Sequence, residues 1–157
     1  MKIKLIAILL MATGCASNEP TSIQSPSVIS NTMSIIASAS EAAPNGVLGE
    51  YQLNIKAAGT QRGVVFLNTE LDYRDQRCVT VTLSPSISAQ LASKYGQSPQ
   101  AFFINKSIMV KGQAKRQKID FYSKGKRTDK YYYQTHILVK DLSQIEVIVD
   151  KAYTQTT

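Results

Sequence analysis

Histidine and cysteine are scarce in this 157-residue chain, which contains one His and two Cys. A conventional Cys/His metal site takes about four such ligands, so His136 and the two cysteines cannot supply one. The sequence also has no Gly-rich phosphate loop and no Gly-x-Ser-x-Gly nucleophile turn. His136 lies in the strand-like stretch YYYQTHILV, where a structural role is typical. We therefore expect a protein that is not an enzyme and that needs no metal or cofactor.

A small acidic group occurs in TELDYRDQR, which holds Glu70, Asp72 and Asp75. Glu70 and Asp72 would share one face of a strand, where they could bind a cation. A solvated hairpin turn explains the same residues, and it is the favoured interpretation.

The N-terminal apolar stretch is short: Leu5 to Met11 is about seven residues, whereas a membrane-spanning helix needs about twenty. Two lysines precede it and small residues follow it, which is a secretory pattern. ATGC at 12–15 resembles the lipobox of bacterial lipoproteins, in which the cysteine carries a diacylglycerol. The resemblance implies a signal peptide at 1–14, a lipidated Cys15 and, because no Asp follows the cysteine, an outer-membrane location facing the periplasm. An ordinary cleaved signal peptide with an unrelated cysteine is the alternative.

Residues 16–46 have no Lys or Arg and are rich in Ser, Ala, Thr, Asn and Pro. This composition shows no sustained apolar period and favours disorder. We expect residues 15–46 to form the lipidated cysteine and a flexible tether with a reach of about 30 Å. The stretch SVISNTMSIIAS could instead fold locally or pack on the following domain. The second cysteine, Cys78, lies in CVTVTL and is expected to be a buried, inert thiol.

Residues 47–153 have the length of one domain, and residues 154–157 form a tail. Alternation of apolar and polar residues predicts strands, whereas Ile87, Leu91 and Tyr95, spaced four apart, predict a short helix. The last strand is broken at KDLS. In chain order the predicted strands are 47–55, 64–71, 78–84, 107–116 and 131–149, and the helix at 84–96 lies between the third and the fourth.

This order of three strands, a helix and two strands is that of the five-stranded Greek-key OB-fold barrel, so the predicted class is mainly β. GVVFLN, INKSIMVKGQAKR and THILVKDLSQIEVI resemble the second, fourth and fifth strands of a family of small bacterial OB-fold lipoproteins assigned to nucleic-acid binding. The resemblance covers about 47–149. An SH3-like barrel is the main rival, but it lacks a helix at that place. Thermonucleases share the OB barrel, yet the Asp-Gly-Asp-Thr-like run typical of them is not found.

An OB fold binds its ligands across the second and third strands, between the loops that follow the first and fourth strands. Those loops are predicted here at 57–63 and 116–130. Nine Lys or Arg residues lie between Lys106 and Lys130, against two acidic residues. Such a concentration of positive charge attracts a polyanion.

Aromatic residues accompany these cations and could stack with bases. If the tyrosine run is a strand, Tyr131 and Tyr133 point to one side and Tyr132 to the other. The predicted ligand-binding residues are Arg62, Lys115, Arg116, Lys118, Phe121, Tyr122, Lys124, Lys126, Arg127, Lys130, Tyr131 and Tyr133.

The chain has a formal charge of +7 and stays basic without residues 1–14, which suits binding of nucleic acid or of another polyanion. The aromatic residues favour a single strand, whose bases can stack on them. Two other hypotheses stay open. The domain could bind a protein partner in the cell envelope with no nucleic-acid role. It could also be a structural lipoprotein whose basic face docks on anionic lipid headgroups of its own membrane.

Overall fold

The computed structural model describes residues 27–149, so the signal peptide predicted at 1–14, Cys15 and the tail predicted at 154–157 lie outside the described residues. Within the described range, no helix is long and apolar enough to cross a membrane. In chain order the elements are β1 (Val28–Ile29), α1 (Thr32–Glu41), β2 (Val47–Asn54), β3 (Ala57–Gln61), β4 (Val64–Asn68), β5 (Val79–Leu83), α2 (Pro85–Tyr95), α3 (Pro99–Phe103), β6 (Ser107–Ser123), β7 (Lys126–Val139), the 3-10 turn η1 (Leu142–Gln144) and β8 (Ile145–Val147).

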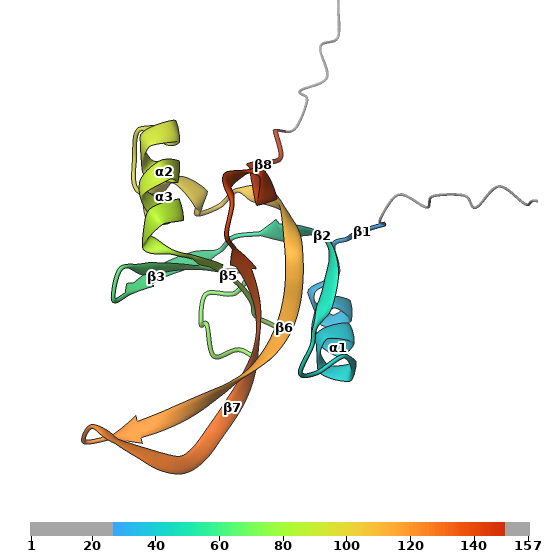
Figure 1. Cartoon of the computed structure of the whole chain (residues 1–157), viewed down its shortest axis with the longest axis vertical. Helices are drawn as coiled ribbons and strands as arrows, with labels where there is room; N and C mark the ends of the chain where they lie inside the picture. Colours follow the sequence, from blue (N-terminus) through green and yellow to red (C-terminus); the bar gives the residue numbers. More distant parts are fainter. Residues whose placement is uncertain (1–26, 150–157) are drawn as a thin grey trace, which may run out of the picture.

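The eight strands of the described chain form one sheet, which curls on itself (Figure 1). Neighbouring strands follow the order β1-β2-β6-β7-β5-β4-β3, and β8 pairs with β6. The β1–β2 and β5–β7 pairs are parallel and the other pairs are antiparallel. The expected mainly β class is confirmed, and the curled sheet is consistent with an OB-like fold.

The first predicted strand, 47–55, ends at a bend at Ile55 and Lys56, after which the chain continues as β3. The N–H of Ile55 donates to the carbonyl of Lys106 at 3.0 Å, whereas the N–H of Lys56 donates to the carbonyl of Asn68 at 2.9 Å. The chain therefore changes its pairing partner from the β6 side to β4 within two residues. This bend, the short β1 and the separation of β8 from β7 explain why eight strands occur in the described range where five were predicted.

Apolar side chains alternate along the strands and meet inside the curl. In β5, Val79 and Leu83 are fully buried in the core, whereas Thr80 and Thr82 lie on the opposite face. Core residues of β2, β6 and β7 pack against them. Cys78, just before β5, is buried as predicted. The opposite face of β5 is consequently left to polar side chains.

The helix predicted at 84–96 is confirmed as α2. The Ser84 side chain caps its first turn by accepting a hydrogen bond from the N–H of Ile87 at 3.3 Å. Gly96 ends the helix with a left-handed φ of 70°. The short α3, which contacts α2, was not predicted.

The tether prediction is wrong for residues 27–46, which contain β1 and α1. The side chain of Asn31 caps α1 by accepting hydrogen bonds from two backbone N–H groups at 2.9 and 3.2 Å. Ile35 and Ala39, four residues apart, are buried against the sheet. The Ser- and Ala-rich composition concealed the helix, because a short helix that packs on a sheet needs few large apolar residues. The alternative, in which this stretch packs on the domain, is correct.

Neither of the two predicted ligand loops is a loop. Residues 57–61 form β3, and residues 116–130 belong to an antiparallel β6–β7 hairpin that projects from the curled sheet (Figure 1). The predicted boundaries were wrong because each hairpin reverses within a single tight turn instead of over a long loop.

Each of these turns consists of one cation followed by glycine. The φ values are 51° and 79° at Arg62 and Gly63, and 49° and 76° at Lys124 and Gly125. Two successive residues with positive φ give a turn whose twist matches that of the flanking strands. The turn chemistry therefore places one cation, Arg62 or Lys124, at the tip of each hairpin.

Replacing Ile35 by Ala in the full chain tests whether α1 belongs to the folded domain. Ile35 is 1% exposed, so the substitution should lower the free energy of unfolding by about 2–5 kcal/mol. Met33, which is 52% exposed on the same helix, is the control, and its replacement by Ala should change stability by less than about 0.5 kcal/mol. Urea unfolding measures both values, and equal effects would mean that α1 does not pack on the sheet.

Candidate ligand-binding site

The β6–β7 hairpin has two faces, and the pairing register decides which side chain lies on each. Ile119 pairs with Tyr132, and Lys118 pairs with Tyr133. Paired residues of antiparallel strands share a face, whereas neighbours in sequence alternate. Tyr132 therefore lies on one face and both Tyr131 and Tyr133 lie on the other, as the sequence predicted.

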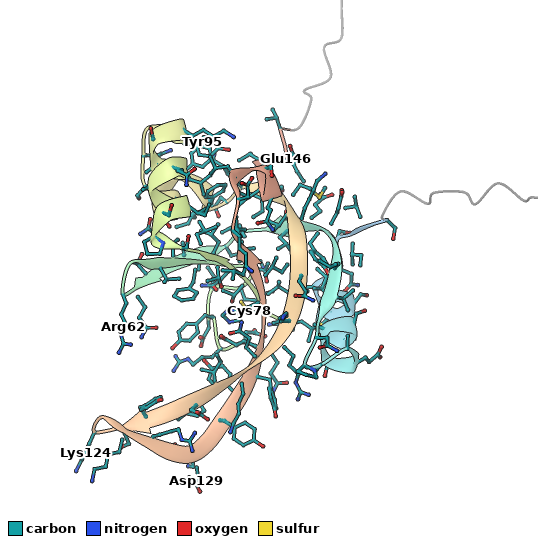
Figure 2. All side chains as sticks on the ribbon, viewed as in Figure 1. Arg62, Cys78, Tyr95, Lys124, Asp129 and Glu146 are labelled. Atoms are coloured by element: carbon teal, nitrogen blue, oxygen red, sulfur yellow. The ribbon has the colours of Figure 1, made fainter. Side chains whose placement is uncertain are left out.

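A cavity of about 600 Å³ lies on the face that carries Tyr132. Side chains of β4, β5 and β7 form its floor, and residues of β3 and β6 form its walls. Figure 2 shows Arg62 and Lys124 at the tips of the two hairpins, on the same side of the molecule. The cavity thus lies between the two segments, 57–63 and 116–130, that the sequence nominated as borders of a ligand face.

Aromatic rings line the cavity. The rings of Phe121 and Tyr132 lie with their centroids 5.1 Å apart at an angle of 37°. A register shift between Asp120 and Tyr122 interrupts the alternation, and both Phe121 and Tyr122 line the cavity. Phe66 stands on the floor. The lining therefore offers flat apolar surface to a planar ligand.

A chain of hydrogen bonds between neutral groups crosses the floor. His136 Nδ1 lies 3.0 Å from Thr82 Oγ1, and His136 Nε2 lies 2.8 Å from Gln134 Oε1. Gln134 Nε2 donates to the carbonyl of Tyr73 at 2.6 Å. Because that amide nitrogen faces the carbonyl, Gln134 Oε1 accepts from the imidazole and the proton of His136 is on Nε2. The network also holds the loop with Tyr73 against β7.

Burial lowers the pKa of His136 from 6.5 to about 4. The side chain is 7% exposed and packs edge to face with Phe66, with ring centroids 6.3 Å apart. The imidazole is therefore neutral at pH 7, and the floor of the cavity carries no formal charge.

The two charged residues that line the cavity are both paired. Asp120 lies 3.4 Å from the ammonium of Lys118 and 3.4 Å from the guanidinium of Arg127. Arg74 Nε lies 3.2 Å from Asp72 Oδ1. Their charges are thus largely compensated, so the lining does not select strongly for an anion or a cation.

The opposite face of the hairpin carries cations stacked on tyrosine rings. The guanidinium carbon of Arg116 lies 3.5 Å from the ring centre of Tyr133, and the ammonium of Lys118 lies 4.3 Å from that of Tyr131. The two tyrosine rings meet edge to face with centroids 5.6 Å apart. Each ring therefore has a cation over one side already. The tyrosines predicted to stack with bases are partly covered, and they lie away from the cavity.

The other predicted site residues extend along the hairpin and its neighbour. Tyr122 pairs with Arg127 near the tip, and Lys115 pairs with His136 near the base. Among residues 27–149, the predicted cations that take part in no ion pair are Arg62, Lys115, Arg116, Lys124, Lys126 and Lys130.

The acidic group predicted after β4 is engaged by cations. Glu70 pairs with Lys56 at 2.7 Å, and Asp75 pairs with Arg77 at 2.7 Å. Hydrogen bonds from Arg77 lower the pKa of Asp75 to about 2. In the described part of the chain, no three His, Cys, Asp or Glu residues come together as a metal site would require. Pairing on an exposed turn accounts for these residues.

Sequence reasoning did not nominate several residues that line the cavity: Phe66, Asn68, Tyr73, Tyr132 and Gln134. Alternation along VVFLN and YYYQTH does carry a signal, because it places the strand residues among them on the outer face of the sheet. Tyr73 has no such signal, since a loop brings it to the cavity.

No protein-family model and no curated protein matches this chain. Solved structures with partial similarity include a protein assigned as an aspartyl-tRNA synthetase from Leishmania major Friedlin, with a TM-score of 0.43 and 10% identity over 85% of this chain. The aspartyl-tRNA synthetase from Entamoeba histolytica gives 0.43 and 12% over 86%. The matched part is 23% and 24% of those two chains. Similarity at this level identifies neither a family nor a function.

Replacing His136 by Gln should remove a pH dependence of stability. The folded-state pKa of about 4 lies below the unfolded value of 6.5, so the unfolded chain gains a proton first as the pH falls. The stability contributed by the neutral ring is complete above pH 6.5 and is lost between that pH and about 4. Urea unfolding at about pH 7.5 and 4.5 should show the unsubstituted protein losing about 2–3 kcal/mol more than the variant. Equal losses would contradict the buried, neutral imidazole.

Proposed function

We propose that this protein binds single-stranded nucleic acid, or another polyanion, at the cavity and the hairpin beside it, and that it is a binding protein and not an enzyme. The observation that carries the proposal is the charge of the hairpin. Between Lys115 and Lys130 it holds seven basic and two acidic residues. These side chains belong to the part of the β6–β7 hairpin, residues 115–130, that projects from the sheet (Figure 2) and is called the arm below. The arm lies next to the aromatic cavity.

The finer fold in this proposal is the five-stranded Greek-key OB barrel. If β2 and β3 are counted as one bent strand, the sheet order becomes a ring: β2 with β3, then β4, β5, β7 and β6. The helices α2 and α3 follow the third strand of that ring, β5. OB folds bind oligonucleotides across their second and third strands. In this chain those strands would be β4 and β5, which contribute to the floor of the cavity.

The charge distribution suits a polyanion with planar groups. Cations without carboxylate partners can replace the counterions of a phosphate backbone, and this gain depends on salt. Aromatic rings provide stacking partners that the charge alone does not. Heparin and polyphosphate share the negative charge but not the planar bases, so they separate the two contributions.

A second candidate is a protein partner in the cell envelope. It is favoured by the face of the hairpin opposite the cavity, where Tyr131 and Tyr133 are 49% and 44% exposed and have cations over their rings. Exposed tyrosine and arginine are enriched at protein interfaces. Such a partner would leave the cavity empty and would bind even when the cavity is blocked.

The proposal also includes the lipid anchor that the N-terminal sequence suggests. A signal peptide at 1–14 and a diacylglycerol on Cys15 would hold the domain at the outer membrane, facing the periplasm. Two or three acyl chains are enough for stable membrane attachment, at about 0.8 kcal/mol for each buried methylene. The ligand would then be one that reaches the envelope.

Neutralising the arm should weaken polyanion binding without unfolding the protein. The variant replaces Lys124, Lys126, Arg127 and Lys130 by Ser, all on the exposed half of the hairpin. For each phosphate that the arm no longer neutralises, the slope of log affinity against log salt should become shallower by about 0.7 for a single strand. Fluorescence anisotropy with a single-stranded oligonucleotide at about 50 and 200 mM salt measures both affinity and slope.

The matched control removes the same charge elsewhere, by Ser replacement of Lys56, Lys94, Lys111 and Lys140, which are exposed and lie outside the arm. A fold-preserving variant replaces Arg62 and Lys124 by Asn, because Asn tolerates positive φ better than either cation. We expect it to bind more weakly and to be at least as stable. If the arm variant and the control bind alike, the arm is not the binding surface.

Replacing Cys15 by Ser tests the anchor separately. The unsubstituted protein, expressed in a bacterium, should incorporate labelled fatty acid and sediment with outer membranes. The variant should incorporate none and should be absent from the outer-membrane fraction, because the thiol that accepts the diacylglycerol is gone. The anchor would be refuted if both proteins partitioned alike and neither incorporated lipid.

A further inference from the structure

The cavity differs in chemistry from the arm beside it. Its floor carries uncharged side chains, and its two charged residues are paired with opposite charges. Among the cations predicted to bind a ligand, those without an ion-pair partner in residues 27–149 lie on the arm and on the β3–β4 turn. A phosphate or sulfate group therefore gains more on the arm than in the cavity, and the cavity suits a part of a ligand that is uncharged.

Asn68 provides a hydrogen-bonding group that is incompletely used. Its side chain lies on the cavity floor and is 6% exposed. The Oδ1 atom accepts a hydrogen bond from the hydroxyl of Thr80 at 2.9 Å. The Nδ2 atom makes no hydrogen bond within residues 27–149. With the amide in this orientation, two N–H donors are available to an acceptor in the cavity.

The walls of the cavity leave space for a flat ring. Phe121 and Tyr132 stand together on one side. Across the cavity, Gly59 pairs with Phe66, and the space above Gly59 is open, because a Cβ added there would meet no atom within 4 Å. A planar group can therefore approach the backbone of β3 while its face contacts an aromatic ring.

We propose that the cavity holds one unpaired nucleobase, with its face against Phe121 and Tyr132 and an acceptor on its edge bonded to the Asn68 amide. This rests on the proposed function and extends it: the arm binds the phosphate backbone, and the cavity selects strands with at least one base free of pairing. A duplex would not satisfy the site, because its bases are stacked and paired.

The test uses uncharged nucleosides, so that the arm plays no part. Adenosine, guanosine, cytidine, uridine and thymidine are titrated to millimolar concentration into the 15N-labelled full chain carrying Cys15→Ser. At least one should shift the amide signals of Gly59, Asn68 and Gln134 in a saturable way, and the shifts should persist at high salt. No saturable shift at these residues with any of the five would overturn the inference.

A blocking variant measures how much the cavity adds to strand binding. Gly59→Leu fills the open space on a strand where glycine is not required for its backbone conformation. It should weaken oligonucleotide binding roughly 5- to 150-fold, the range expected for one stacked base, and leave heparin binding unchanged. The control, Tyr131→Leu, lies on the opposite face of the hairpin and should change oligonucleotide affinity less than Gly59→Leu. Equal oligonucleotide affinities of Gly59→Leu and the unsubstituted protein would overturn the inference.

A second variant probes the base edge itself. Asn68→Asp keeps an oxygen to accept from Thr80 and replaces the free donor by an acceptor. It should change which nucleoside binds best, and an unchanged order of preference would contradict the role of the amide.

The outcomes distinguish failure of the proposed function from failure of the base site. If nucleosides bind and the arm variant binds oligonucleotides as the unsubstituted protein does, only the role of the arm is refuted. If heparin and the oligonucleotide bind alike with the same salt dependence, and Gly59→Leu changes neither affinity, only the base site is refuted.

Discussion

The antiparallel pairing of β6 with β7 is the interaction on which the rest of the structure depends. β6 has 17 residues and β7 has 14, so their ladder begins in the core and continues beyond the curled sheet. Near its base, Ala114 and Ile137 are fully buried. Further out the same register continues without a core, and alternation alone decides which side chains face the cavity. A slip of one residue would exchange the two faces and bring Tyr131 and Tyr133 to the cavity in place of Tyr132.

This pairing divides between two faces the aromatic residues that are adjacent in the sequence. KRQKIDFYSKGKRTDKYYYQTH reads as an undivided basic and aromatic stretch. In the folded hairpin, Ile119 and Tyr132 face the cavity, whereas Lys118 is on the other side with its ammonium over Tyr131. Lys115, which pairs with His136, is on the Tyr132 side near the base of the hairpin. In the proposed function, the cations at the tips attract a polyanion from solution, and the cavity distinguishes what that polyanion carries. Affinity and selectivity would thus come from neighbouring surfaces of one hairpin.

Much of the core could be predicted from the sequence, since Val79 and Leu83 alternate with threonines and a capped helix follows with its apolar residues four apart. The two hairpin turns could not, because Arg-Gly and Lys-Gly are weaker turn signals than Asn-Gly and were interpreted as parts of loops. The helix α1 was concealed by small residues whose burial depends on the sheet. The cavity joins five strands and a loop, so Asn68 and Tyr73 become neighbours of Tyr132 only after folding.

The central claim is that a bound strand lies on the cavity face of the hairpin. Photo-crosslinking tests it most directly, with a single-stranded oligonucleotide that carries 5-iodouracil and with mass spectrometry to locate the adduct. The account predicts adducts on Phe121 or Tyr132, the rings that lie together in the cavity. Adducts confined to Tyr131 and Tyr133, on the opposite face, would contradict it.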